Sequence, residues 1–208
     1  MEAQTKEAQD KMTPDKSLNE LRLGNQRFVN KNQLNRDLLQ QVKQTSAGQY
    51  PFATILSCID SRVSSELIFD QGIGDIFSVR IAGNFVNEDI LGSMEFACKL
   101  AGTKLILVLG HTACGAVKGA CDHARLGNLT ALINKIEPAV EAVIEPKEES
   151  QRNSSNINFV NSVAEKNVEM TISNIRSSSP VLAEMEEQGS IKIIGGMYDI
   201  DTGIVHFI

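Results

Sequence analysis

The chain has 208 residues, of which 42% are apolar and 22% charged, and this ordinary globular composition excludes wholesale disorder. It carries 20 Lys and Arg against 26 Asp and Glu, so its formal net charge is −6, which argues against a nucleic-acid partner because such binding needs a basic face. The longest strongly apolar run, Leu105 to Leu109, is far shorter than the roughly 20 residues of a membrane helix, so we expect no membrane partner.

The N-terminal region is predicted to be a helical arm. Residues 1–12 are polar, and we expect them to be disordered or mobile. Thr13 is a typical helix cap, and Pro14 suits the first helical position. One face of this helix is an apolar stripe, formed by Leu18, Leu21, Phe28 and Val29. The stripe must be buried, either on the chain's own domain or, as an arm of about residues 13–48, on a second subunit.

From Phe52 onward, short apolar strands alternate with helices. The strands are expected at 52–56, 76–81, 104–109, 191–194 and 204–208, the last as an edge strand. The helices are expected at 64–70, 88–100, 113–125, 129–136, 160–175 and 179–188, with a break or kink at Pro138. Continuous apolar strands that alternate with helices predict an α/β fold with a mostly parallel central sheet and flanking helices.

Two motifs stand directly after predicted strands. Cys58-x-Asp60-x-Arg62 follows the first strand, and His111-x-x-Cys114 follows the third. Sites in open parallel sheets form at the carboxyl ends of the strands, so the two motifs meet if these strands are neighbours. Cys58, His111 and Cys114 then offer two thiolates and one imidazole, a ligand set that suits Zn²⁺ and leaves a fourth position open.

Asp60 has two alternative roles, as a fourth ligand or as a base next to the metal. Zn²⁺ with two thiolates and a neutral imidazole has no net charge, so Asp60 and a hydroxide would compete for the fourth position. Arg62 can hold Asp60 away from the metal through charge-assisted hydrogen bonds. We therefore predict an open site near neutral pH, although the pair could also be a simple structural salt bridge.

Four cysteines in a chain of this length are too few for a disulfide-stapled scaffold. Cys98 falls in line with Met94 on one predicted helix, and Cys121 lies two turns after Cys114 on another. We expect both Cys98 and Cys121 to pack in the core. Buried core thiols are the alternative interpretation for Cys58 and Cys114 as well.

The two motifs resemble those of the β-class carbonic anhydrases. The resemblance extends through Arg80-Ile81-Ala82-Gly83-Asn84 and the ending Gly195-Gly196-Met197-Tyr198-Asp199, and it covers most of the chain from about Leu18. It implies a zinc lyase, carbonic anhydrase, that reversibly hydrates CO₂ to bicarbonate and a proton by attack of zinc-bound hydroxide. Residues 13–208 would then form one catalytic domain that includes the arm, with one Zn²⁺ per subunit.

The resemblance also assigns roles to individual residues. It makes Cys58, His111 and Cys114 the metal ligands and the Asp60–Arg62 dyad the catalytic group that orients the hydroxide. It implies a homodimer or tetramer with active sites at the subunit interface. Substrate-binding roles fall on three further residues: the Gln49 amide, the Phe77 ring and the Gly115 backbone N–H. Ile55 stands where the bicarbonate-inhibited subfamily has Trp, which argues against that subfamily's regulatory site.

Two rival functions fit the same residues. One is a hydrolase of carbon disulfide or carbonyl sulfide on the same scaffold, and the other is a non-catalytic interaction domain stabilised by zinc. A thiol redox protein would favour a C-x-x-C motif, which the sequence lacks. The compartment stays open between the cytoplasm, since no apolar signal stretch begins the chain, and the periplasm, if Ala3 or a neighbour is a processed start.

Overall fold

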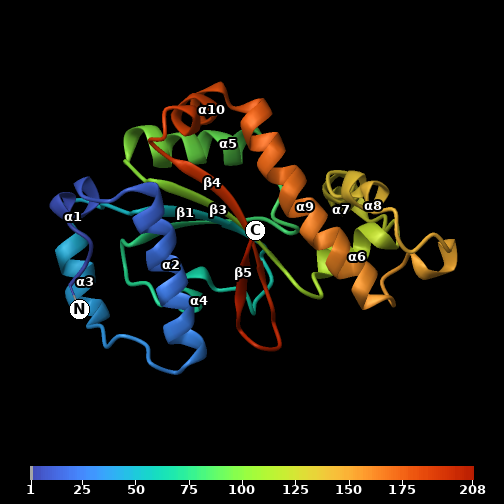
Figure 1. Ribbon diagram of the computed structural model, residues 1–208, viewed down its shortest axis with the longest axis horizontal. Helices are drawn as coiled ribbons and strands as arrows, with labels where there is room; N and C mark the ends of the chain where they lie inside the picture. The colour runs from blue at the N-terminus through green and yellow to red at the C-terminus, as the bar shows by residue number, and fades with distance from the viewer. Residues whose placement is uncertain (1) are drawn as a thin grey trace.

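The computed structural model describes residues 2–208 and is built around a five-stranded sheet with the strand order β2-β1-β3-β4-β5 (Figure 1). The strands are β1 (Ala53–Ser57), β2 (Ile76–Arg80), β3 (Leu105–His111), β4 (Lys192–Tyr198) and β5 (Val205–Phe207). The pairs β1–β2, β1–β3 and β3–β4 are parallel, and only β5 is antiparallel, on the edge next to β4. This confirms the predicted α/β fold with a mostly parallel sheet.

Ten α-helices surround the sheet within the described residues. They are α1 (Lys6–Asp10), α2 (Pro14–Val29), α3 (Leu38–Thr45), α4 (Ser65–Ile68), α5 (Glu88–Glu95), α6 (Gly115–Cys121), α7 (Gly127–Ile133), α8 (Glu137–Ala142), α9 (Ile157–Ser178) and α10 (Pro180–Glu187). A π-helical turn, Phe96–Leu100, continues α5, and a 3₁₀ turn, Glu149–Gln151, precedes α9. Most predicted elements exist, and their bounds differ by a few residues.

The central strands β1 and β3 are buried along their whole length. Alternate side chains of β3 enter two different cores, because successive residues of a strand point to opposite faces. Leu105 and Leu107 pack on the face covered by α2 and α4, whereas Ile106 and Val108 pack on the face covered by α5, α9 and α10. Burial on both faces explains the continuous apolar runs in the sequence.

Helix α2 begins as the sequence predicts. Thr13 caps it by accepting a hydrogen bond from the Lys16 N–H, and Pro14 is its first residue. Leu21 is fully buried in the core that also contains Phe52 and Ile55, so the apolar stripe of α2 packs on the chain's own domain. Figure 1 shows α2 lying across this face of the sheet. Phe28 and Val29, at the end of the stripe, are only half-buried, so a contact of this arm with a second subunit stays a prediction.

The segment before α2 folds against the domain, although the sequence suggests a mobile stretch over residues 1–12; Met1 lies outside the described residues. Helix α1 occupies its centre, and the buried Gln9 donates hydrogen bonds to the backbone oxygens of Pro51 and Ala101, both at 2.8 Å. The sequence does not predict this contact of Gln9, because a buried Gln with two hydrogen bonds cannot be told from an exposed one by composition.

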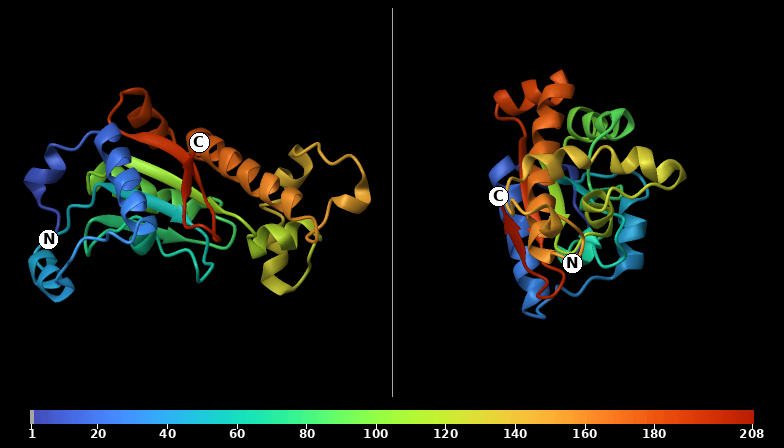
Figure 2. Two further views of the ribbon diagram at one scale, coloured as in Figure 1. Left: turned by 60° about the horizontal axis from the view of Figure 1, so that its bottom comes forward. Right: turned by 90° about the vertical axis from the view of Figure 1, so that its right-hand side faces the viewer.

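Helices α6, α7 and α8 form a lobe that projects from one end of the molecule (Figure 2). Helix α6 is shorter than predicted because Ala113 and His123, which flank it, have φ values of 55° and 49°, outside the helical region. The helix predicted over 129–136 is interrupted rather than kinked before Pro138: α7 ends at Ile133, and Pro138 lies in the first turn of α8, where its missing N–H costs nothing.

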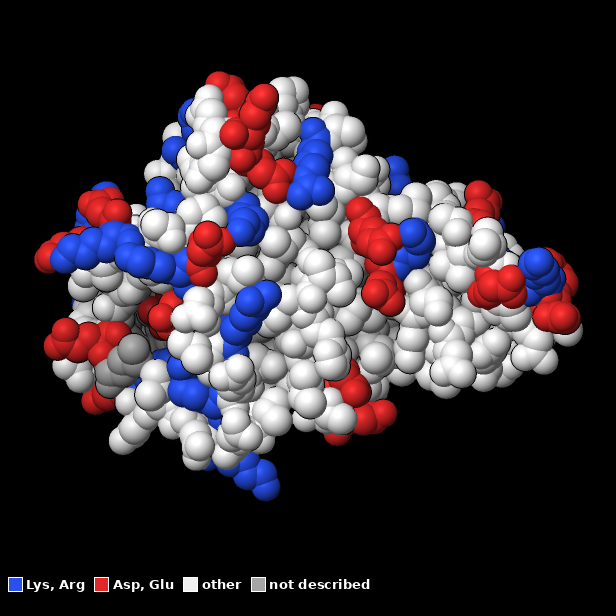
Figure 3. All heavy atoms as spheres, viewed as in Figure 1, with Lys and Arg blue, Asp and Glu red and all other residues white. Residues whose placement is uncertain are grey.

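Basic and acidic side chains are interspersed on the face seen in Figure 3, around a broad uncharged area. Of the helices described, none has both the length and the apolarity to cross a membrane.

Candidate metal centre

The two motifs meet at the carboxyl end of the sheet, because β1 and β3 are neighbours in parallel register. Cys58 follows β1 directly, His111 is the last residue of β3, and Cys114 caps the start of α6. One candidate ligand atom from each of these three residues lies within 4.8 Å of the other two, and all three residues are buried. The two Sγ atoms are 3.9 Å apart. This group could hold a metal ion.

The imidazole of His111 presents a free lone pair to the two sulfurs. Its Nδ1 lies 2.9 Å from the Thr112 carbonyl oxygen, and a carbonyl only accepts, so Nδ1 carries the proton. The other nitrogen, Nε2, is buried without any hydrogen-bond partner. A buried polar atom without a partner is costly, and a metal ion bound by Nε2 and the sulfurs would satisfy it. The donor set therefore fits Zn²⁺.

The two thiols do not share negative charge equally. A hydrogen bond from the Cys114 thiol, aided by the Gly83 N–H, lowers the pKa of Cys58 well below its usual range despite burial. The hydrogen bond to the Cys58 thiolate, together with burial, raises the pKa of Cys114. The pair alone therefore holds one negative charge, and a divalent cation is the group that would let both sulfurs ionise.

Asp60 is tied to Arg62 at the mouth of this group. Arg62 Nε donates to Asp60 Oδ1 at 2.9 Å and Arg62 Nη2 to Oδ2 at 2.8 Å, the two parallel bonds of a bidentate pair. These bonds hold the pKa of Asp60 far below its usual range, so the carboxylate stays ionised. Its Oδ2 is 4.0 Å from His111 Nε2. The carboxylate thus faces the candidate ligands while Arg62 holds it.

The substrate-binding predictions fall in different places. Gly115 begins α6 beside Cys114 and is exposed. Gln49 precedes β1 and lines a hollow with Gln9 and Tyr50, at the opposite end of that strand from Cys58. Phe77 lies on the edge strand β2, with its ring centre 6.3 Å from that of Phe96. A single chain therefore brings Gly115 to the group but neither Gln49 nor Phe77.

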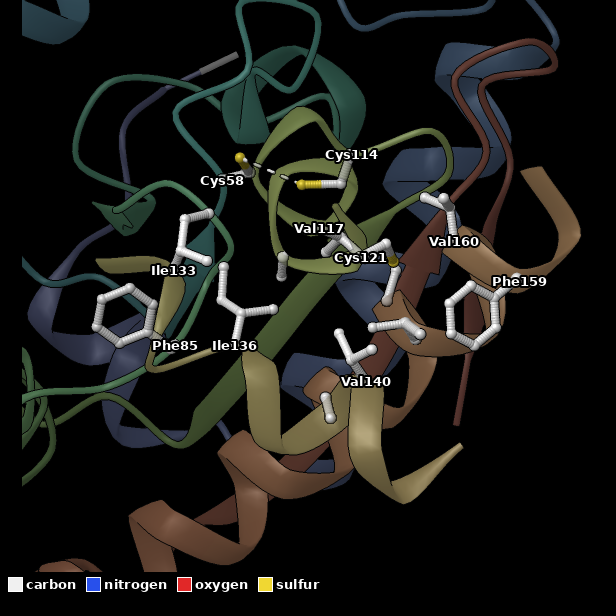
Figure 4. Packing of buried hydrophobic residues seen from close by; sticks show 14 residues of the cluster. Cys58, Phe85, Cys114, Val117, Cys121, Ile133, Ile136, Val140, Phe159 and Val160 are labelled. Carbon is white, nitrogen blue, oxygen red and sulfur yellow. Dashed lines mark hydrogen bonds between the residues drawn. The ribbon is translucent and has the colours of Figure 1, made fainter. Parts of the chain in front are cut away.

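Cys98 and Cys121 are buried in apolar clusters, as the sequence predicts. Figure 4 shows the sulfurs of Cys58 and Cys114 turned toward each other, with Cys121 apart from them among the apolar side chains beneath. Sequence reasoning missed Arg80 as an anchor of the Cys58 loop: its guanidinium donates to the carbonyl oxygens of Cys58 and Asp60. The position of Arg80 in the segment Arg80 to Asn84, which resembles the β-class carbonic anhydrases, could have indicated this role.

Comparisons with known proteins agree with this arrangement. The family model for carbonic anhydrase matches residues 53–205. Carbonic anhydrase 2 of Mycobacterium tuberculosis is 37% identical over 158 residues, which are 76% of this chain and 74% of that protein. The β-carbonic anhydrase CafA of Aspergillus fumigatus has a TM-score of 0.71 at 27% identity, over 80% of this chain and 79% of that one.

A tetrameric β-carbonic anhydrase of Sordaria macrospora has a TM-score of 0.68 at 22% identity, over 81% of this chain and 89% of that one, and it supports the fold alone. The fold and the Cys-His-Cys group thus define an α/β protein with a candidate metal centre at the carboxyl end of its sheet. The chain belongs to the carbonic anhydrase family, within its β class.

Proposed function

We propose that the chain binds one Zn²⁺ at Cys58, His111 and Cys114 and catalyses the reversible hydration of CO₂ to bicarbonate and a proton. The observation that carries this proposal is the unpartnered Nε2 of His111, which lies buried beside two sulfurs and 4.0 Å from an Asp60 oxygen. A structural metal site would close with a fourth Cys or His. Among the described residues, this group contains three such ligands.

Zn²⁺ in this group would supply the Lewis acidity that brings the pKa of a water molecule close to neutrality. The ionised Asp60 would accept a hydrogen bond at Oδ2 and so orient the attacking oxygen. Arg62 would fix the carboxylate in that position through its two hydrogen bonds. Because the Arg62 side chain is 53% exposed, the pair is open to solvent, which suits a site that must release a proton at every turnover.

We also propose that the active form is a homo-oligomer, a dimer or a tetramer. Gln49 and Phe77 lie away from the metal group in their own chain, so their substrate-binding roles require that a second copy bring them to it. Exposed apolar side chains near the arm offer a surface for such a copy: Leu38, Leu39, Val42 and Leu67. The family likeness supports the same proposal.

Stopped-flow CO₂ hydration, with metal content measured on the same sample, tests the function. We expect activity in proportion to bound zinc and its loss after chelation, with recovery when Zn²⁺ is added back. Zinc-loaded protein without CO₂ hydration would contradict the proposal. The rate of carbonyl sulfide hydrolysis, measured in parallel, tests the rival function. A hydrolase on the same scaffold would turn over carbonyl sulfide faster than CO₂.

A further inference from the structure

Two irregular backbone segments adjoin the candidate ligands, one that carries His111 and Cys114 and one that contacts Cys58, so something must hold them in place. In the His111–Cys114 turn, Ala113 has a φ of 55°, which an L-residue rarely adopts. In the other segment, Gly83 has a φ of 79°, and its N–H donates to Cys58 Sγ at 3.4 Å. The Ala113 conformation persists only if the surroundings fix it, whereas Gly83 adopts its positive φ without strain.

Two asparagines of helix α9 contact these two segments. Asn161 Oδ1 accepts a hydrogen bond from the Ala113 N–H at 2.9 Å. Asn167 Nδ2 donates to the Gly83 carbonyl oxygen at 2.7 Å, and Asn167 is only 3% exposed. Each partner is a backbone group of fixed polarity, so Asn161 acts as an acceptor and Asn167 as a donor.

Helix α9 can deliver these amides because it lies close against the end of β3. A Cβ at Gly110, next to His111, would be only 2.6 Å from Val168 Cγ2, so the missing side chain permits this close approach. Val160 and Ala164 of the same helix belong to the apolar cluster that contains Cys58 and Cys114. One rigid helix thus packs beneath the site and contacts both of its loops.

We propose that Asn161 and Asn167 are positioning residues for the metal centre. Asn161 holds the turn that carries His111 and Cys114, and Asn167 holds the segment whose Gly83 N–H contacts Cys58. The proposal rests on the proposed function, since it needs a metal at these three ligands. Both side chains form these hydrogen bonds with backbone groups, so each acts on the ligands through the backbone.

Replacement of each asparagine by aspartate separates the two roles, because aspartate keeps the shape and the acceptor but loses the donor. Asn161→Asp should retain zinc affinity within about threefold, while Asn161→Ala should weaken it about tenfold or more. Asn167→Asp should weaken it at least as much as Asn167→Ala, since two acceptors then face each other. Asn174→Asp, at an exposed position on the same helix, is the matched control.

Zinc affinity is measured by competition with a chromophoric chelator on the purified full chain, and the thiolate-to-metal absorption of Co²⁺-substituted protein reports the ligand geometry. Urea unfolding of each metal-free variant shows whether the helix itself has been destabilised. Equal effects of Asp and Ala at position 161, a neutral Asn167→Asp, or affinity losses matched by Asn174→Asp would overturn the proposal. If the unmodified chain binds no zinc, the proposed function fails instead.

Discussion

Asp60 Oδ2 lies 4.0 Å from His111 Nε2 while the same carboxylate accepts two hydrogen bonds from the Arg62 guanidinium. One carboxylate therefore faces two alternatives, the metal group on one side and the guanidinium on the other. Because Arg62 stays charged at every relevant pH, it holds the carboxylate whenever Asp60 is ionised. Under the proposed function, Arg62 would be the residue that keeps the fourth metal position open.

Arg62→Ala should free Asp60 to bind the metal and should lower CO₂ hydration, although no ligand has been removed. The substitution should also let the pKa of Asp60 rise toward its ordinary value, because the side-chain hydrogen bonds that lower it most are lost while the backbone N–H of residue 62 still donates. Stopped-flow rates and zinc content of one sample provide the measurement. Undiminished activity, or a structure of the unmodified chain at neutral pH with Asp60 on the metal, would leave the dyad as a salt bridge only.

Cys58→Ala and His111→Ala should each lose zinc and activity together, because the two remaining ligands bind Zn²⁺ weakly. Cys121→Ala is a matched control: it removes a buried thiol from the same apolar cluster, and we expect it to keep zinc and activity. Metal analysis after gel filtration and CO₂ hydration assays check both. A Cys58→Ala variant with normal activity and no zinc would refute the metal assignment.

Asp70→Asn should destabilise the fold by about 3–5 kcal/mol at pH 7, since it breaks a buried ion pair. The Asp70 side chain is 3% exposed and bonded to Arg27 and Arg36. Burial alone would raise the pKa of Asp70, but the hydrogen bonds from the two arginines outweigh it and hold this pKa below its ordinary value.

The sign of the pH dependence follows from that lowered pKa. The stabilisation by Asp70 is present above the unfolded pKa, about 4, and is lost as the pH falls through the folded pKa. Urea unfolding should therefore show a difference between Asp70→Asn and the unmodified chain that shrinks from pH 7 toward pH 3. Asp10→Asn, which removes an exposed pair with Lys6, should change stability by less than about 1 kcal/mol. A constant difference across the pH range would contradict the assignment.

Gly110→Ala should destabilise the protein by about 1–3 kcal/mol, because its Cβ would overlap Val168 at the contact between β3 and α9. Gly92→Ala is the control with the opposite sign. Its Cβ meets nothing within 4 Å on helix α5, and alanine there should stabilise by about 0.5–1 kcal/mol. The urea unfolding midpoints of the two variants provide the measurement. Similar midpoints would contradict the prediction, because α9 would then shift away from β3 at little cost.

The predictable parts of this structure are those that local chemistry determines. Thr13 and Pro14 define the start of α2, and the continuous apolar runs mark β1 and β3. The spacing of His111 and Cys114 after a strand places both at one edge of the sheet. Helix bounds in the lobe were less accurate, because a positive φ at Ala113 leaves no trace in composition.

Contacts between distant segments stayed hidden. Asn161 and Asn167 are ordinary polar residues of an amphipathic helix in the sequence, and their partners lie 48 and 84 residues away. The role of Gln9 could not be predicted for the same reason, since its two backbone acceptors belong to loops that come together only in the folded chain. Gln49 and Phe77 are a different case, because the interpretation of their positions depends on a second subunit.

The separation of the candidate ligands along the chain has a kinetic consequence. Cys58 and Cys114 are 56 residues apart, and they meet only when β1 and β3 have paired. Of the three candidate ligands, only His111 and Cys114 are close in sequence, so a metal bound to all three would stabilise the paired strands and little that precedes them. A bound metal should therefore slow unfolding more than it accelerates folding, so its main effect would be on the kinetic stability of the native state.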